Sequence, residues 1–104
     1  MVAAMSTITG PADGMAEIAR MAKETLDGWL RAYDGYRGLI VFTDEKNQRA
    51  RVITLWSTPQ DEARARQSRG AMRDQVAAMA GMVVEGLEVY DAPVVDVLAE
   101  SGRA

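Results

Sequence analysis

The chain has 104 residues, 48% of them hydrophobic and 26% charged, which is typical of one soluble globular domain. Its net charge of −3 offers no basic field for phosphate backbones, so nucleic acid is not an expected partner. It contains no cysteine and no histidine, which excludes disulfides, thiolate nucleophiles, imidazole bases and the usual zinc and haem ligands.

No segment of the chain is typical of targeting to a membrane. Residues 1–10 lack the basic start and the apolar stretch of a signal peptide, and no apolar run approaches the roughly 18 residues of a membrane span. We therefore expect a cytoplasmic protein without a membrane partner. A single domain should occupy residues 1–104, with residues 99–104 as a frayed tail.

The first third of the chain predicts a strand followed by a long helix. Residues 2–9 alternate weakly in polarity and end at a Gly-Pro pair, as a short strand does. From Asp13, a candidate N-cap, apolar residues recur with helical spacing for five turns, and Gly35 is placed to end the helix. The charged residues between them are expected on the solvent side: Glu17, Arg20, Lys23, Glu24, Asp27 and Arg31.

Residues 36–43 and 49–56 predict a β-hairpin around a polar turn at 44–48. Both strands carry apolar side chains on both faces, because Leu39 and Val41 alternate with Ile40 and Phe42 in the first of them. One face can pack on the helices of the domain. The other face needs a second cover.

The second half of the chain predicts another helix and a last strand. Thr58 suits an N-cap with proline at the first helical position, and a break or a kink in this helix is expected near Gly70. Residues 82–90 predict the last strand, and residues 92–98 an additional short strand. The order strand-helix-strand-strand-helix-strand defines an α+β, ferredoxin-like fold with an antiparallel sheet.

The hairpin and the segment after it, GLIVF…RVITLWSTPQDEARA, resemble the antibiotic biosynthesis monooxygenase family, most clearly at the junction Leu55-Trp56-Ser57. The resemblance implies a dimeric α/β barrel, in which two sheets pack face to face across a two-fold axis. It therefore agrees with the uncovered strand face in predicting a homodimer. It also implies oxygenation of a small aromatic, polyketide-like molecule without a cofactor.

Position by position, the resemblance transfers only part of the active site. Cofactor-independent members are similar in having an Asn four residues before the tryptophan, a Tyr six after it and an Arg twenty after it. Those positions are Val52, Glu62 and Val76 in this chain. Trp56 is retained, and Arg73 lies one helical turn from the Arg position. We therefore expect Trp56 and Arg73 as the catalytic pair, with Arg73 stabilising a phenolate and Trp56 orienting it.

The haem-degrading members of the family place their axial His nineteen residues after the same tryptophan, where this chain has Gln75. An amide does not replace an imidazole on haem iron, so haem degradation is not expected. The other candidate residues for substrate binding share a helix stripe or strand face that could line a cavity: Trp29, Tyr33, Tyr36, Thr54, Met72, Gln75 and Met79. For these residues and for Trp56, ordinary core packing is the competing interpretation.

Two alternatives to the oxygenase remain open. One is a non-catalytic dimeric module that binds a small molecule or a protein, and the other is an aromatic polyketide cyclase-like enzyme of the same topology. A closed cavity of at least about 300 Å³ beside Trp56, with Arg73 pointing into it, would favour an enzyme, whereas a filled core there would exclude both the oxygenase and the cyclase.

Overall fold

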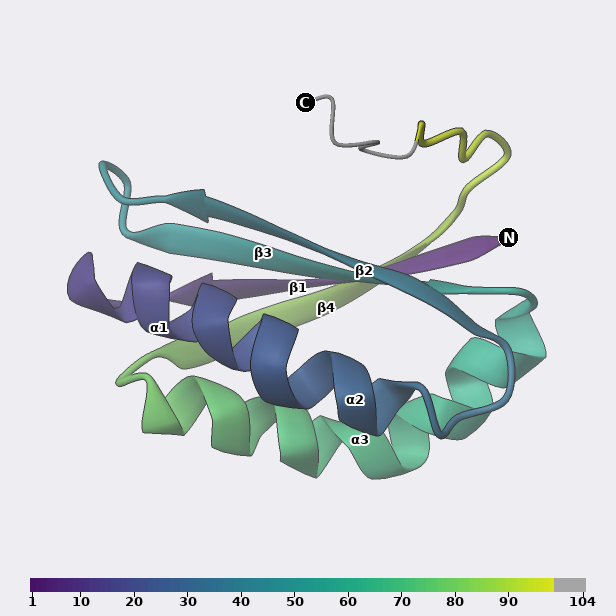
Figure 1. Cartoon of the computed structure of the whole chain (residues 1–104), viewed down its shortest axis with the longest axis horizontal. Coiled ribbons are helices and arrows are strands. Elements are labelled where there is room, and N and C mark those ends of the chain that lie inside the picture. The colour runs from purple at the N-terminus through teal and green to yellow at the C-terminus, as the bar shows by residue number, and fades with distance from the viewer. Residues whose placement is uncertain (99–104) are drawn as a thin grey trace.

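The computed structural model of the protein describes residues 1–98, except for the side chains of residues 69–73, so the predicted frayed tail lies outside it. One layer of helices packs against one face of a four-stranded sheet (Figure 1). The elements follow one another as β1 (Val2–Thr9), α1 (Asp13–Met21), η1 (Ala22–Leu26), α2 (Asp27–Leu30), β2 (Tyr36–Asp44), β3 (Arg49–Trp56), α3 (Pro59–Met79) and β4 (Val83–Asp91).

The sheet has the strand order β2-β3-β1-β4, and all three pairs of neighbours are antiparallel. This confirms the predicted ferredoxin-like class. Strands β1 and β3 run side by side along their whole length, from Val2 opposite Trp56 to Thr9 opposite Arg49. The two edges of the sheet are β2 and β4.

The first predicted helix forms as α1, η1 and α2 in direct succession, with a π-helical turn in the middle. A π-turn adds a residue to the turn and often marks a functional region of a helix. The prediction that Asp13 is the N-cap is wrong. The helix begins at Asp13 itself, where the carboxylate favours the positive end of the helix dipole, and Ala12 occupies the cap position without a side-chain hydrogen bond.

The second predicted helix, α3, begins as expected, because the Thr58 hydroxyl accepts a hydrogen bond from the Asp61 backbone N–H at 3.0 Å. The predicted break near Gly70 is wrong, since α3 continues through 21 residues to Met79. One glycine in a helix interior costs only about 1 kcal/mol. Burial of Val76 and Ala77 against the rest of the core offsets that cost. Among the helices of the described residues, none is long and apolar enough to cross a bilayer.

The core lies between the inner face of the sheet and the helices. Strand β1 alternates strictly, with every second side chain buried from Val2 to Ile8. Trp56 is the largest fully buried side chain, and Met15, Ile18 and Leu30 cover the sheet from the helix side.

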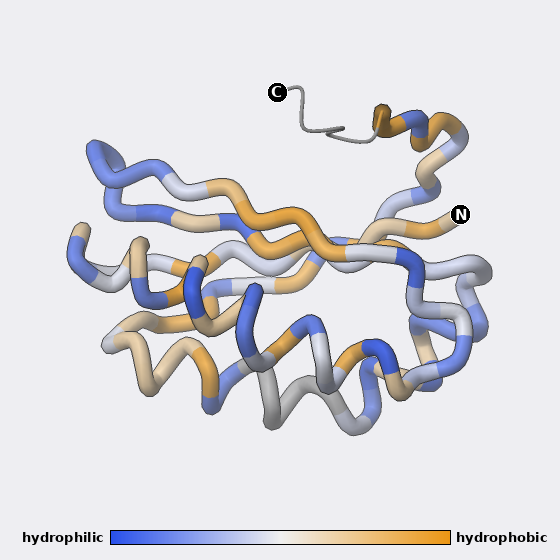
Figure 2. Tube along the Cα trace, viewed as in Figure 1, coloured by the Kyte–Doolittle hydropathy of each residue, from blue (hydrophilic) through white to orange (hydrophobic). Residues whose placement is uncertain are grey.

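No helix among residues 1–98 lies over the outer face of the sheet (Figure 1). On β2, Leu39 and Val41 pack against the core, whereas Ile40 and Phe42 stay 36% and 56% exposed on the other face. Figure 2 shows hydrophobic residues concentrated in the middle of the strands. The second cover that the hairpin requires is therefore not supplied by the described residues of this chain.

The prediction of an extra strand at 92–98 is wrong for the single chain. The ladder ends where the Ala92 backbone N–H donates to the Met1 carbonyl oxygen at 2.8 Å, and the following residues form no strand. A strand needs a neighbour for its backbone groups, and the segment leaves the sheet on the open side (Figure 1).

Two glycine substitutions should act in opposite directions on stability. Gly35 has a φ of +82°, and a Cβ there would lie 2.2 Å from an Asp61 carboxylate oxygen. We expect Gly35→Ala to lower the free energy of unfolding by about 1–3 kcal/mol. Gly28 lies in a helix, and nothing is within 4 Å of a Cβ added there. Gly28→Ala should therefore raise the free energy of unfolding by about 0.5–1 kcal/mol. Urea denaturation measures both, and a tolerated Gly35→Ala would contradict the turn geometry.

Candidate functional site

Trp56 ends β3 beneath the helices and is 0% exposed. Its indole N–H donates to the Thr54 hydroxyl at 2.9 Å, within the buried interior. Its ring makes edge-to-face contacts with Tyr33 and Tyr36, at centroid distances of 6.4 Å and 5.5 Å. The structure therefore brings four of the sequence-predicted site residues together. We call Tyr33, Tyr36 and Trp56 the aromatic cluster.

Tyr36 connects the aromatic cluster to a charged pair on α2. Its hydroxyl donates to one carboxylate oxygen of Asp27 at 2.6 Å, and the other oxygen accepts from Arg31 Nε at 2.9 Å. The pKa of Tyr36 is raised, mainly because the phenol is partly buried and also because it donates a hydrogen bond to Asp27. The pKa of Asp27 is lowered, mainly by the hydrogen bond from Tyr36 and also by the one from Arg31. At neutral pH the tyrosine is protonated and the carboxylate is charged.

A groove of about 410 Å³ lies between this helical face and the edge strand β2. Lys23, Asp27 and Arg31 follow one another at intervals of four residues, which puts them on one side of the helix. Gly38 lies on the opposite wall, at the point where the register of β2 against β3 shifts. The groove is lined by Ala19, Ala22, Lys23, Asp27, Arg31, Gly38, Leu39 and Val41.

The groove combines an apolar wall with cationic side chains at its rim. Its volume falls in the range of small-molecule sites, and its two cations outnumber its one carboxylate. The arrangement suits a small, mostly apolar ligand that carries a negative charge.

A much smaller void of about 10 Å³ lies in the core, and Ala22 lines both it and the groove. Its lining is wholly apolar and includes Val52 and Val76, two positions at which the family resemblance places an Asn and an Arg. Valine cannot replace the hydrogen bonds of either side chain. At these positions the chain has core packing instead of a polar pocket.

Glu62 stands at the third of these positions, where the resemblance places a Tyr. Its side chain is 1% exposed, and Arg66 Nε donates to it at 3.0 Å. The hydrogen bond to Glu62 raises the pKa of Arg66. A side chain buried this completely needs a hydrogen-bond partner, and Arg66 supplies it.

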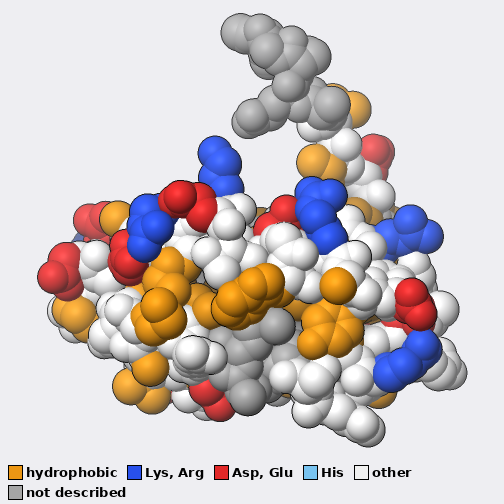
Figure 3. All heavy atoms as spheres, turned by 60° about the horizontal axis from the view of Figure 1, so that its bottom comes forward, with side chains coloured by type: hydrophobic (Ala, Val, Ile, Leu, Met, Phe, Trp, Pro, Cys, Tyr) orange, Lys and Arg blue, Asp and Glu red, His pale blue; other side chains and the backbone are white. Residues whose placement is uncertain are grey.

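Of the other candidate residues, the three whose side chains the structure describes do not join the aromatic cluster. Trp29 and Met79 are 44% and 67% exposed, and Gln75 is also exposed. The side chains of Met72 and Arg73 lie outside the described residues, although both positions belong to α3. With the helix side turned forward, hydrophobic side chains form a band across the middle of the molecule, with charged groups along its border (Figure 3).

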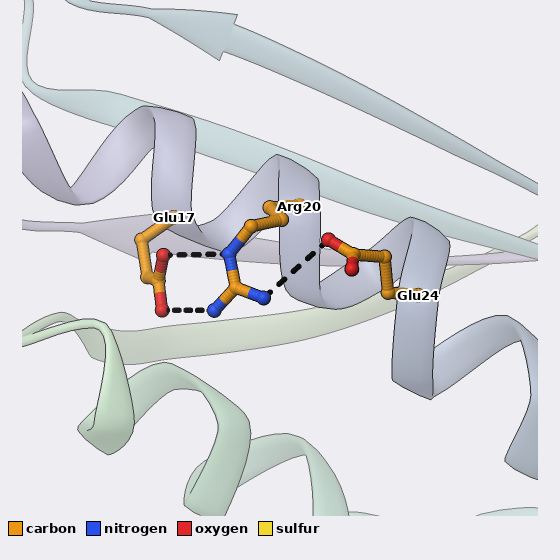
Figure 4. A network of polar contacts seen from close by, with 3 residues as sticks. All are labelled: Glu17, Arg20 and Glu24. Atoms are coloured by element: carbon orange, nitrogen blue, oxygen red, sulfur yellow. Dashed lines mark hydrogen bonds and ion pairs between the residues drawn. The ribbon is translucent and has the colours of Figure 1, made fainter.

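Lys23 and Arg31 are exposed, as helical spacing predicted, and Asp27 is half-buried. Sequence reasoning missed that the edge strand β2 lies beside them and forms a groove. The intervals of four residues were the available signal. A neighbouring network shows the ordinary solvent-facing case: Arg20 donates to Glu17 at 3.0 Å and to Glu24 at 3.4 Å, all three being exposed (Figure 4). Hydrogen bonding to Arg20 lowers the pKa of Glu17.

No protein-family model matches the chain, and no curated protein matches its sequence. Solved structures do share its fold. A protein described as a candidate antibiotic biosynthesis monooxygenase from Deinococcus radiodurans has a TM-score of 0.68 at 14% identity, over 95% of this chain and 100% of that one. The ActVA-Orf6 monooxygenase of Streptomyces coelicolor was solved with the ligand nanaomycin D. It has a TM-score of 0.66 at 12% sequence identity, over 94% of this chain and 90% of that one.

A third structure, SnoaB of Streptomyces nogalater, is named a cofactor-independent oxygenase. It has a TM-score of 0.60 at 16% identity, over 90% of this chain and 94% of that one. The fold is thus that of the antibiotic biosynthesis monooxygenases, as the sequence resemblance predicted. Identities this low extend the likeness to the fold alone.

The pH dependence of stability tests the network of Asp27. Because the pKa of Asp27 is lower in the folded protein, its contribution to stability is complete above the unfolded value of about 4 and is lost as the pH falls through the folded value. The gap in unfolding free energy between wild type and Asp27→Asn should therefore be widest at neutral pH and close on acidification. Tyr36→Phe should reduce this pH dependence. A gap that stays constant into acid would contradict the network.

Proposed function

We propose that the protein is a cofactor-independent oxygenase that acts, as a homodimer, on a small aromatic, polyketide-like molecule bound as an anion in the groove. The groove itself carries the proposal, because it combines an apolar wall with the cations Lys23 and Arg31. The fold shared with proteins named as oxygenases of this kind supports the same reaction class.

The proposed reaction needs only the substrate and dioxygen. An electron-rich phenol of the anthrone type gives up a proton to water in the groove, and Lys23 and Arg31 stabilise the resulting anion. The anion passes one electron to dioxygen, and the radical and superoxide combine to form a C–O bond. Protonation gives a hydroperoxide, which loses water to leave a carbonyl. One CH₂ group becomes C=O, and one dioxygen yields one water.

In this proposal Trp56 is a positioning residue. Its ring fixes Tyr36, whose hydroxyl holds Asp27, and Asp27 orients Arg31. Arg73 on α3, which the sequence predicts as a cation for the phenolate, is the alternative to the cations of the groove. The uncovered outer face of the sheet supports the homodimer, since Ile40 and Phe42 lie exposed on it.

Quinone formation from anthrone-type phenols under oxygen tests the oxygenase. Removing one cation from the groove by Lys23→Ala should lower kcat/KM about tenfold or more, because less negative charge is stabilised. Arg20→Ala is the matched control, since Arg20 is paired with two glutamates outside the groove and should leave the rate unchanged.

Two results would count against this proposal. Quinone formation no faster than in buffer would exclude the oxygenase for these substrates. Full activity in Lys23→Ala with a large loss in Arg73→Ala would move the reaction from the groove to α3.

A non-catalytic, small-molecule-binding module of the same fold is the second candidate. The apolar lining at Val52 and Val76 favours it, because the polar groups of the family's oxygenases are missing there. This module would bind the phenolates in calorimetric titration, with weaker binding in Lys23→Ala, and would consume no dioxygen. Dioxygen uptake that depends on the substrate and the protein would exclude it.

A further inference from the structure

The two cations of the groove, Lys23 and Arg31, are aligned by the π-helical turn of the helix that carries them. In a regular α-helix, positions with this spacing lie roughly 80° apart around the axis, at about 3.6 residues per turn. In the π-turn the Asp27 backbone N–H donates to the Ala22 carbonyl oxygen, which takes one additional residue into the turn. The segment from Lys23 to Arg31 then makes about two full turns. Both side chains therefore lie on one line along the helix, and both line the groove.

The two cations lie at separate places along the groove. Two turns of helix put their backbone positions about 11 Å apart along the axis. Apart from Lys23, Asp27 and Arg31, the lining consists of small or apolar residues: Ala19, Ala22, Gly38, Leu39 and Val41. A ligand that reaches both cations must therefore have an apolar body with an oxygen group at each end.

Asp27 lies between the two cations, but both of its carboxylate oxygens already accept hydrogen bonds. One accepts from the Tyr36 hydroxyl at 2.6 Å and the other from Arg31 Nε at 2.9 Å. The carboxylate therefore orients the guanidinium and offsets one of the two positive charges. One positive charge remains in the groove, which suits a ligand with a single negative charge.

The two cations differ in the acceptor that they suit. The two terminal nitrogens of Arg31 have no hydrogen-bond partner among the described side chains. A guanidinium presents these nitrogens as a planar fork, which matches the two oxygens of a carboxylate. Lys23 forms no hydrogen bond or ion pair with any described side chain. Its compact ammonium group suits a single oxygen, such as that of a phenolate.

We propose that the groove takes an aromatic acid of two or three fused rings, with its carboxylate at Arg31 and a phenolic hydroxyl at Lys23. This rests on the groove of the proposed function and deepens it by naming the substrate class. The carboxylate balances the remaining positive charge of the groove. The phenol then lies where Lys23 stabilises its anion once the proton has left for water.

Calorimetric titration with three naphthalenes tests this recognition. One is a hydroxynaphthoic acid with its two groups at opposite ends of the rings, and the others are the naphthol and the naphthoic acid that each lack one group. We expect the hydroxynaphthoic acid to bind at least about tenfold more tightly than either. Arg31→Lys keeps the charge and loses the fork, so it should weaken binding of the two carboxylates about tenfold and leave naphthol unchanged.

Arg64→Lys is the matched control for Arg31→Lys. Arg64 is also paired with an aspartate of its own helix, Asp61, and it is not among the residues that line the groove. The control should leave the affinity for all three naphthalenes unchanged. Arg31 and Arg64 are 73% and 62% exposed, so both variants should fold, which circular dichroism checks.

Ionisation of the bound phenol shows which end of the ligand lies at Lys23. Asp27 and Arg31 are the other charged residues of the groove lining, and none lines it from β2. A cation beside the hydroxyl favours the phenolate, so the pKa of the phenol in bound hydroxynaphthoic acid should be lower than in the free acid. Lys23→Gln should remove this shift, whereas Arg31→Lys should keep it. Ultraviolet absorbance of the phenolate against pH measures both, and the opposite pattern would overturn the orientation.

The outcomes separate this recognition from the oxygenase. Equal affinities for hydroxynaphthoic acid and naphthol, or an unchanged affinity in Arg31→Lys, would overturn the recognition alone. No binding of any of the three naphthalenes would overturn it together with the groove as a ligand site. Binding that depends on both groups, without quinone formation from anthrones that carry the same two groups, would confirm the recognition and overturn the oxygenase.

Discussion

The connections of this chain put every helix on the same face of a four-stranded sheet, and the rest of the structure depends on that constraint. The inner face gains a complete core around Trp56. On the outer face Ile40 and Phe42 are exposed to solvent. Residues 92–98, which follow β4, lie on the same side of the sheet. A chain of this size has little apolar surface to spare, so leaving one face open is costly unless a second copy covers it.

The buried tryptophan organises the helix side. It holds Thr54 through its N–H and packs against Tyr36, which reaches Asp27 on the helix above. In the proposed function this tryptophan therefore acts through its neighbours. The polar side chains of the fold's oxygenases are replaced by Val52 and Val76 in the core, while the cations of this chain gather in a groove at the sheet edge. The reaction proposed for the chain therefore takes place in the groove and not beside Val52 and Val76.

Sequence patterns predicted the elements and their order, because burial imposes a period on strands and helices that a single chain displays. They failed where the outcome depends on neighbours in space. Gly70 suggested a break, but packing on the sheet maintains the helix. Lys23 and Arg31 are exposed as predicted, but periodicity shows only which side of a helix is polar and not that β2 lies beside it. Thr54 shares a strand face with Trp56, as the alternation predicted, whereas the ring contacts of Trp56 depend on Tyr33 in the turn after α2 and on Tyr36 at the start of β2.

The oligomeric state in solution is the most direct test of whether a second copy covers the outer face of the sheet. Light scattering of the wild-type protein at micromolar concentration should give the mass of a dimer, and Phe42→Asp should shift the mass toward that of a monomer, because it places a carboxylate in an apolar contact. A monomer mass for the wild-type protein would contradict the account.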